Sequence, residues 1–466
     1  MTDQTHANQE NIRVDAAIHL YFPLYTPKPE AFRLSFLRSD DWTAVALKPE
    51  HYMRYIRSIC YDPHDPRQNP LAANALVLQH DGIQGVFWLR EHDVSLNGVR
   101  LYCFDTSIAF LDLKMEIQTE SLAAVANITS DLRQADKWIK QRQDTEPNGD
   151  TPPKPYRNIQ LEAFAEKLLD QWDKTYRMFD HIGKDGAHRA DMFVAVHCDR
   201  EPEGVDFQMY RIAEGLDSRY EGTPPEEAFY AQHSYLRWAI TSKSVCSLAF
   251  PTSNQWDRKF TDEWISRAEA KHVLWYILAI HQRHAMYRKL NEISQKETLH
   301  DLRKYQEEIV FFNTKYRFAL VAEDPAYQVP YQMLRDAKQT ESVFADIDEE
   351  IERINDYHDT VDDRNNVIAM TIVSLICMIS TVIDVFQLEG IDGTLRAVIG
   401  GVAFLAFLIV VGILARHSIE DWGRQIMRKW RHRSYSRSIH APCKDGSRLV
   451  RFLKNSKLFG KFGKKG

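Results

Sequence analysis

The stretch VIAMTIVSLICMISTVIDVF, residues 367–386, decides the predicted fold. It contains one ionisable side chain with a charge at neutral pH, Asp384, and a second run, 397–415, contains none. A bilayer core of roughly 30 Å is crossed by about twenty helical residues, so each run is long enough to span it. We therefore predict two transmembrane helices, at about 367–386 and 397–415. A pair of buried core helices is the alternative.

Charge is divided unevenly along the chain. The segment from Arg424 to the C-terminus carries fourteen Lys or Arg residues and one acid, Asp445, which gives it a charge of +13. Because the whole chain carries −6, residues 1–423 carry −19. Basic residues beside a membrane span favour the cytoplasmic side. We therefore predict a protein of the bacterial inner membrane with both termini in the cytoplasm.

The long N-terminal region has the pattern of a mixed α/β domain. Short apolar runs such as ALVLQH and DMFVAVH predict strands, and LEAFAEKLLDQWDKTYRMF predicts an amphipathic helix. Asn97-Gly98 predicts the two-residue turn of a hairpin. From Asp262 onward the pattern is helical. The predicted organisation is a cytosolic α/β domain (1–258), a cytosolic helical region with a stalk (259–365), a two-helix transmembrane domain (366–416) and a basic cytosolic tail (417–466).

A heptad pattern of mainly apolar residues precedes the first predicted span. Its members follow one another at alternating spacings of four and three: Met333, Ala337, Thr340, Phe344, Ile347, Ile351, Ile354, His358 and Val361. Neither Gly nor Pro occurs between Tyr331 and Phe386, so we predict one unbroken helix from the stalk into the first span. The pattern permits packing against earlier helices of the same chain or against identical subunits.

The first predicted span carries small or polar residues along one helical face. This stripe consists of Asn366, Met370, Ser374, Cys377, Thr381 and Asp384. In a ring of identical helices the stripe would line a central path, and Glu389 and Asp392 would lie at its outer mouth. Acidic rings attract cations. The alternative is that the small polar residues allow close helix packing.

The order of these parts resembles the CorA family of divalent-cation channels. The resemblance rests on FADIDEEIERINDYHDTVDDRNNVIAMTIVSLICMIS, on VLWYILAIHQRHAMYRKLNEIS and on the paired C-terminal runs. It implies a homopentameric funnel: an α/β cytosolic domain, a long helical stalk and two C-terminal transmembrane helices, the first lining the pore. The sequence departs from the family where Gly-Met-Asn is expected, because VFQLEGIDG stands there.

Two functions follow from this resemblance. The first is a CorA-like channel that passes cations through a homo-oligomeric pore gated by its cytosolic domain. The second is a membrane effector of a bacterial antiviral, CRISPR-type system, opened by a nucleotide-type messenger. We predict no enzymatic activity, because the sequence contains no phosphate-binding, dinucleotide-binding, zinc-protease or serine-hydrolase motif.

Acidic residues of the predicted stalk suggest a regulatory metal site. Mg²⁺ or another divalent cation could bridge subunits through carboxylates. The candidate ligands are Asp346, Asp348, Glu349, Glu352, Asp356 and Asp359. A solvated acidic helix face is the alternative. The basic tail interleaves Lys and Arg with Leu and Phe, and we predict that it contacts anionic lipid in preference to nucleic acid.

Overall fold

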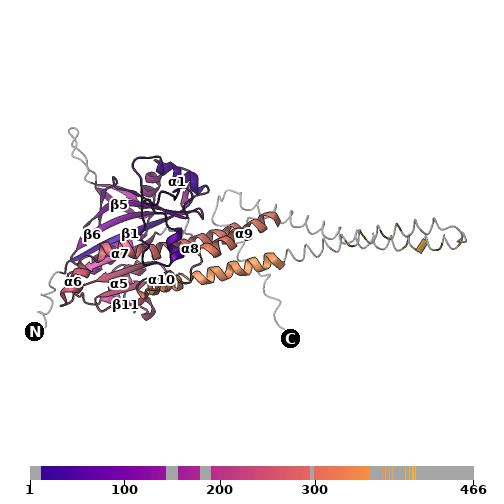
Figure 1. Cartoon of the computed structure of the whole chain (residues 1–466). Helices are drawn as coiled ribbons and strands as arrows, with labels where there is room; N and C mark the ends of the chain where they lie inside the picture. The colour runs from indigo at the N-terminus through magenta and orange to yellow at the C-terminus, as the bar shows by residue number, and fades with distance from the viewer. Residues whose placement is uncertain are drawn as a thin grey trace, which may run out of the picture. The chain divides into compact units, whose positions relative to one another are not determined.

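The computed structural model describes most of the first 356 residues. The described residues are 12–142, 156–178, 190–293 and 299–356, together with the nine isolated positions 370, 373, 377, 380, 394, 398, 401, 402 and 405. The chain divides into two compact units, Met1–Ile354 and Asn355–Gly466. The first unit contains all thirteen strands and the helices α1 to α10 (Figure 1).

One large mixed sheet forms the centre of the first unit. Its thirteen strands follow the order β11-β12-β13-β10-β1-β6-β5-β4-β7-β8, with β3 on β5, β2 on β3, and β9 on β1. Strands β10 and β13 pair in parallel, and the other pairs are antiparallel. The strands are β1 (Val14–Tyr25), β2 (Thr43–Val45), β3 (Ala75–His80), β4 (Gly85–Leu89), β5 (His92–Phe104), β6 (Ile108–Thr119), β7 (Trp138–Arg142), β8 (Tyr156–Gln160), β9 (Arg177–Met178), β10 (Asp191–Cys198), β11 (Phe229–His233), β12 (Leu236–Ile240) and β13 (Ser244–Ala249).

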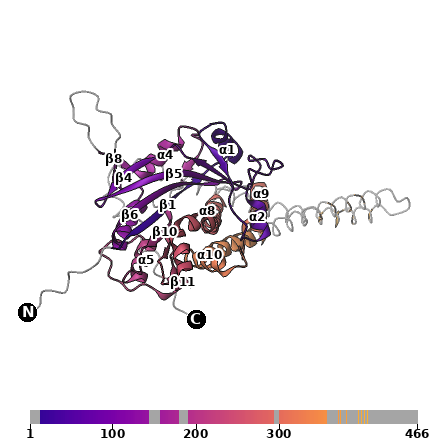
Figure 2. The ribbon, with the colours of Figure 1, turned by 60° about the vertical axis from the view of Figure 1, so that its left-hand side comes forward.

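Helices cover both faces of this sheet, because alternate residues of its central strands are apolar on both sides. In β10, Met192 and Val194 pack into one core with α3 and α5, whereas Phe193 packs into the other with α7 and α8. Figure 2 shows α8 beside α10, with α5 beyond β10. The helices are α1 (Pro29–Leu37), α2 (Arg54–Ile59), α3 (Leu122–Arg133), α4 (Leu161–Leu169), α5 (Val205–Glu214), α6 (Gln255–Asp262), α7 (Trp264–Lys271), α8 (Val273–Ile293), α9 (Leu299–Tyr316) and α10 (Pro325–Ala337).

The hairpin predicted at Asn97-Gly98 is wrong. Strand β5 continues through both residues, and its pairing with β6 shifts register between Leu96 and Gly98. The chain instead turns at 105–107, where Ser107 has a φ of 65°. A local shift of register accommodates Asn-Gly inside a strand because a bulge takes up one extra residue.

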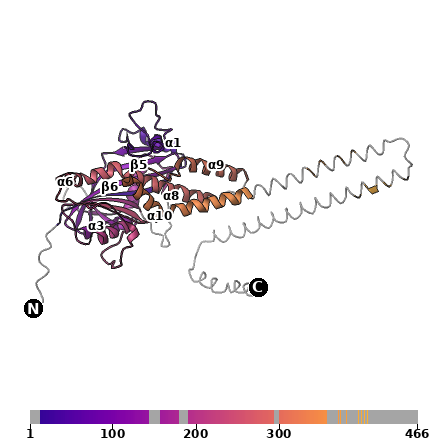
Figure 3. The same cartoon turned by 60° about the horizontal axis from the view of Figure 1, so that its bottom comes forward.

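The heptad pattern packs within its own chain over the described residues. Phe344 and Ile347 are buried in the core that also contains α8 and α9. Figures 1 and 3 show α9 running alongside the orange segment that follows α10, and the Phe312 and Phe344 rings lie 6.4 Å apart. His358 and Val361 lie outside the described residues. The burial observed here supports the same-chain alternative.

The predicted unbroken helix is also wrong. Helix α10 ends at Ala337, and a turn at 338–339 separates it from the helical residues 340–356. Gln339 has a φ of 53°, which lies in the left-handed region. Because neither Gly nor Pro marks this position, the local sequence gives no sign of the break.

The predicted fold class must be corrected. The described residues form a thirteen-stranded mixed sheet with helices on both faces rather than an α/β domain on a CorA-like funnel with a helical stalk. In this described part, no helix is both long enough and apolar enough to cross a bilayer. This finding contradicts three further predictions: a transmembrane protein, a membrane channel and a location in the bacterial inner membrane. Residues 367–386 and 397–415 themselves lie outside the described residues, except for the isolated positions.

Candidate functional site

A cavity of about 230 Å³ lies between the sheet and the helices α7 and α8. Its polar floor comes from three neighbouring elements: Gln79 of β3, Arg100 of β5 and Glu269 of α7. Its remaining lining consists of Val45, Ala46, Leu47, Lys48, Val77, Tyr102, Ser266, Ala270, Val273 and Leu274. The cavity therefore combines an apolar wall with a few converging polar groups, as small-molecule sites do.

Arg100 dominates the electrostatics of the cavity. Its Nε donates a hydrogen bond to Oε1 of Gln79 at 3.0 Å, which fixes the plane of the guanidinium. Burial opposes the charged form of Arg100, but Tyr102, Asp112 and Glu269 outweigh burial and raise its pKa. The guanidinium therefore stays charged on the wall of a partly enclosed space. Such a group is suited to bind a carboxylate or phosphate.

A buried ion cluster lies behind this floor. Nδ1 of His19 lies 3.0 Å from Asp112, and its Nε2 lies 3.5 Å from Glu269. Lys114 lies 2.8 Å from Glu269. Burial alone would lower the pKa of His19, but Asp112 and then Glu269 raise it to about 9. Burial likewise opposes ionisation of Glu269, yet His19 and Lys114 hold its pKa at about 2.

This cluster predicts a decline of stability at alkaline pH. The folded-state pKa of His19 is about 9 and its ordinary value is 6.5, so its protonation stabilises the fold fully below pH 6.5. That contribution is lost as the pH rises from 6.5 through 9, and it amounts to about 3 kcal/mol. We expect urea unfolding free energies to fall over this interval. His19→Gln should flatten the profile, and an unchanged slope in that variant would exclude His19 as the titrating group.

The register of the sheet places the cavity at the end of a polar row. Cross-strand partners point to the same face of a sheet. Successive strands pair Gln79 with Arg100, Arg100 with Asp112, Asp112 with Tyr21, and Tyr21 with Asp191. These five side chains therefore form a line across the face that α7 and α8 cover.

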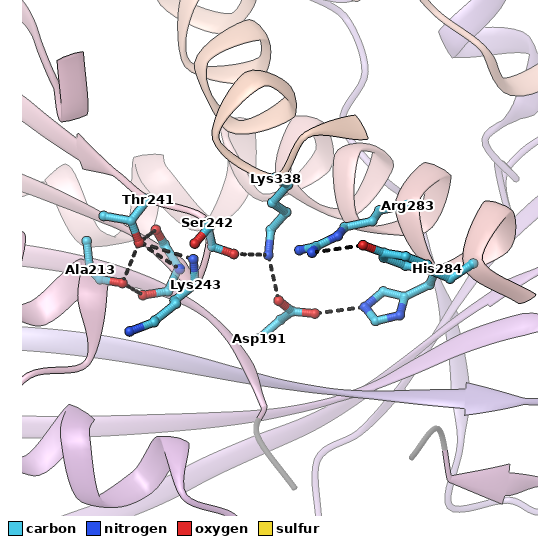
Figure 4. A network of polar contacts seen from close by, with 10 residues as sticks. Asp191, Ala213, Thr241, Ser242, Lys243, Arg283, His284 and Lys338 are labelled. Atoms are coloured by element: carbon cyan, nitrogen blue, oxygen red, sulfur yellow. Dashed lines mark hydrogen bonds and ion pairs between the residues drawn. The ribbon is translucent and has the colours of Figure 1, made fainter. Parts of the chain in front are cut away.

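The far end of the row is a second buried ion cluster, shown in Figure 4. Nζ of Lys338 donates to Asp191 at 2.8 Å and to the carbonyl oxygen of Ser242 at 2.9 Å. Nε2 of His284, on α8, lies 2.9 Å from the other oxygen of Asp191. Burial lowers the pKa of both Lys338 and His284, and Asp191 opposes that effect in each. This cluster joins β10 to α8 and to the end of α10.

The predicted pore residues are not brought together in the part of the chain that the structure describes. Met370 and Cys377 are helical and exposed. Asn366, Ser374, Thr381 and Asp384 lie outside the described residues, as do Glu389 and Asp392 of the predicted outer mouth. Their proposed role in passing cations stays a prediction.

The acids predicted as a regulatory metal site are exposed on the helical residues 340–356, apart from Asp359, which lies outside the described residues. Asp348 pairs with Arg317 at 2.9 Å, and Glu349 pairs with Arg353 at 2.6 Å. Over the ranges that the structure describes, no group of three or more His, Cys, Asp or Glu residues is arranged to hold a metal ion. Asp346, Glu352 and Asp356 are each exposed as well.

The sequence analysis missed the residues that form the cavity and its polar row. One signal was available: His19 and Asp112 interrupt otherwise apolar strand segments, IHLYF and IAFLDL. A charged residue on a buried strand face requires a partner. Comparison with protein-family models, curated proteins and solved structures finds no match to this chain. The resemblance to the CorA family therefore stays untested by relatives.

Proposed function

We propose that the unit 12–354 is a ligand-binding regulatory unit, and that its cavity takes a small organic anion with an apolar body. The observation that carries this proposal is the position of Arg100, a half-buried guanidinium oriented by Gln79 on the cavity floor. Val77, Val273 and Leu274 line the same space and would contact the apolar part of the ligand. A nucleotide-type ligand, which the CorA resemblance implies for the alternative function, is one member of this class.

The balance of charge favours an anion over a cation. Arg100, Lys114 and His19 are offset by three carboxylates, those of Asp112, Glu269 and Glu116, so the cluster behind the floor is close to neutral. Lys48 lines the cavity, is exposed, and adds one positive charge. A cationic mouth raises the association rate of an anionic ligand, with a dependence on ionic strength.

Binding without turnover fits the chemistry of this floor. His19 lies beside Glu269 of the floor, and its pKa of about 9 keeps it protonated at neutral pH. A protonated imidazole cannot accept a proton, so it cannot act as a general base there. Its ion pairs with Asp112 and Glu269 assign it a role in holding α7 against the sheet.

Substitution of Arg100 tests the proposed function. We expect Arg100→Gln to weaken the binding of a suitable anion about 10- to 100-fold, because a charge-assisted hydrogen bond is worth about 1.5–3 kcal/mol. Isothermal titration calorimetry would compare adenosine monophosphate, a phosphate monoester, with phenylacetate, a carboxylate. Each joins an anionic group to an aromatic ring, through a ribose in adenosine monophosphate and through a methylene group in phenylacetate.

Arg219→Gln is the matched control, because Arg219 is exposed and pairs with its neighbour Asp217. We expect this control to bind as the parent does. The proposal fails if neither anion binds the parent chain. It also fails if the two arginine variants bind with equal affinity.

A further inference from the structure

The break between α10 and the residues 340–354 is held by tertiary contacts. Gln339 adopts a φ of 53°, in the left-handed region, which is less favourable for a non-glycine residue than the helical conformation. The local sequence contains no helix-breaking residue at this point, so it favours a straight helix. Something outside the segment must therefore oppose that preference.

Lys338 supplies the opposing contact. Its ammonium group is buried and donates to Asp191 and to the carbonyl oxygen of Ser242 (Figure 4). Returning Gln339 to a helical φ would move α10 relative to 340–354 and would displace Lys338 from these acceptors. The segment thus has two competing arrangements, a broken form held by Asp191 and a straight form favoured by local conformation.

The polar row connects this break with the cavity. Arg100 and Asp191 stand three strands apart, which is roughly 14 Å at the usual strand spacing. Between them lie the hydroxyl groups of Tyr21 and Tyr276, which have no hydrogen-bond partner among the described residues. The pKa of Tyr276 is raised by burial and then by Asp191 and Asp112, so both carboxylates act on one hydroxyl.

We propose that an anion bound at Arg100 favours the broken form of the helix at Lys338 and Gln339. This inference rests on the proposed function, because it describes the regulation of the same cavity. The bound anion offsets the charge of Arg100, so the charge of Asp112 is less compensated. The Tyr21 and Tyr276 hydroxyl groups then turn toward Asp112. With these hydroxyl groups turned away from it, Asp191 attracts Lys338 more strongly than in the ligand-free protein. The broken form of the helix is then more stable.

Amide hydrogen exchange of the full chain, followed by mass spectrometry, measures this coupling. With saturating adenosine monophosphate or phenylacetate, we expect exchange in 340–354 to slow at least about fivefold, the lower end of typical coupling between sites. Calorimetry records binding separately. Exchange that stays unchanged while heat of binding is observed overturns the coupling and leaves the proposed function intact.

Three variants keep the test decisive. Gln339→Gly relieves the left-handed strain and so favours the broken form without ligand. Exchange in 340–354 should therefore be slow before ligand is added, and the ligand should slow it no further. The affinity for the ligand should be equal to that of the parent or higher. Tyr21→Phe should retain binding but reduce the ligand effect on exchange. Tyr210→Phe, on α5 at the opposite face of the sheet, is the control and should behave as the parent.

An arm without ligand separates failure of the coupling from failure of the proposed function. Arg100→Gln removes the same positive charge that an anion would offset, so it should slow exchange in 340–354 by itself. If no anion binds the parent, the proposed function fails. The exchange measurement on Arg100→Gln still tests whether the polar row couples the cavity to the helix break. Exchange in Arg100→Gln equal to that of the parent would then overturn the coupling.

Discussion

Asp112→Asn lowers the free energy of unfolding by about 3–5 kcal/mol near neutral pH, the expected loss when one partner of a buried ion pair is removed. Asp112 and His19 are both fully buried, and their side chains are 3.0 Å apart. Asparagine preserves the size of the side chain but leaves the imidazolium with Glu269 alone, at 3.5 Å. Urea denaturation at pH 6.5, followed by circular dichroism, measures the loss.

The same substitution should change the pH profile. Asp112 is the largest of the influences that raise the pKa of His19 to about 9, so without it the folded-state pKa moves back toward 6.5. The decline of stability between pH 6.5 and 9 should therefore become shallower. Glu116→Gln is the control, because Glu116 is 42% exposed and its pair with Lys114 is worth about 1 kcal/mol or less. Equal losses in the two variants would contradict a buried cluster.

Phe344→Ala should also lower the unfolding free energy by about 3–5 kcal/mol, through the cavity that it leaves in a packed core. The Phe344 side chain is fully buried, and the guanidinium of Arg317 lies 4.5 Å from its ring centroid. Because these contacts lie within one chain, the loss should appear at any protein concentration. Urea denaturation at two concentrations tenfold apart measures it.

Light scattering after size exclusion provides the complementary measurement for Phe344. The oligomeric mass should be the same for the parent and the variant, because the ring packs against α9 of its own chain. Ser342→Ala, at an exposed position of the same helix, is the matched control. A reduced mass in Phe344→Ala, with stability nearly unchanged, would indicate that the heptad pattern joins subunits instead.

Several strands could be predicted from local pattern because each carries its own evidence. ALVLQH and DMFVAVH form β3 and the greater part of β10, and both are rich in apolar residues that a sheet buried on two faces requires. LEAFAEKLLDQWDKTYRMF begins as a helix, α4, but the helix ends at Leu169. Local patterns of this kind identify the existence of an element better than its ends.

The candidate site could not be predicted because its residues come together through long-range register. His19 and Asp112 are 93 positions apart, and their contact depends on the pairing of β1 with β6. Glu269 joins them from α7, the helix that packs on this face of the sheet. A shift of one residue in that pairing would turn each side chain to the opposite face.

By itself, the sequence determined that segments such as ALVLQH and DMFVAVH are strands and that LEAFAEKLL is an amphipathic helix, since alternation and helical spacing act over a few residues. It also determined that 333–354 has an apolar seam, but not what the seam contacts. Tertiary structure alone decided that α9 covers this seam, that the helix breaks at Lys338, and that Arg100 stands at the end of a polar row. These features depend on burying charge beside a distant partner, and burial is a property of the assembled sheet and helices, which no local pattern contains.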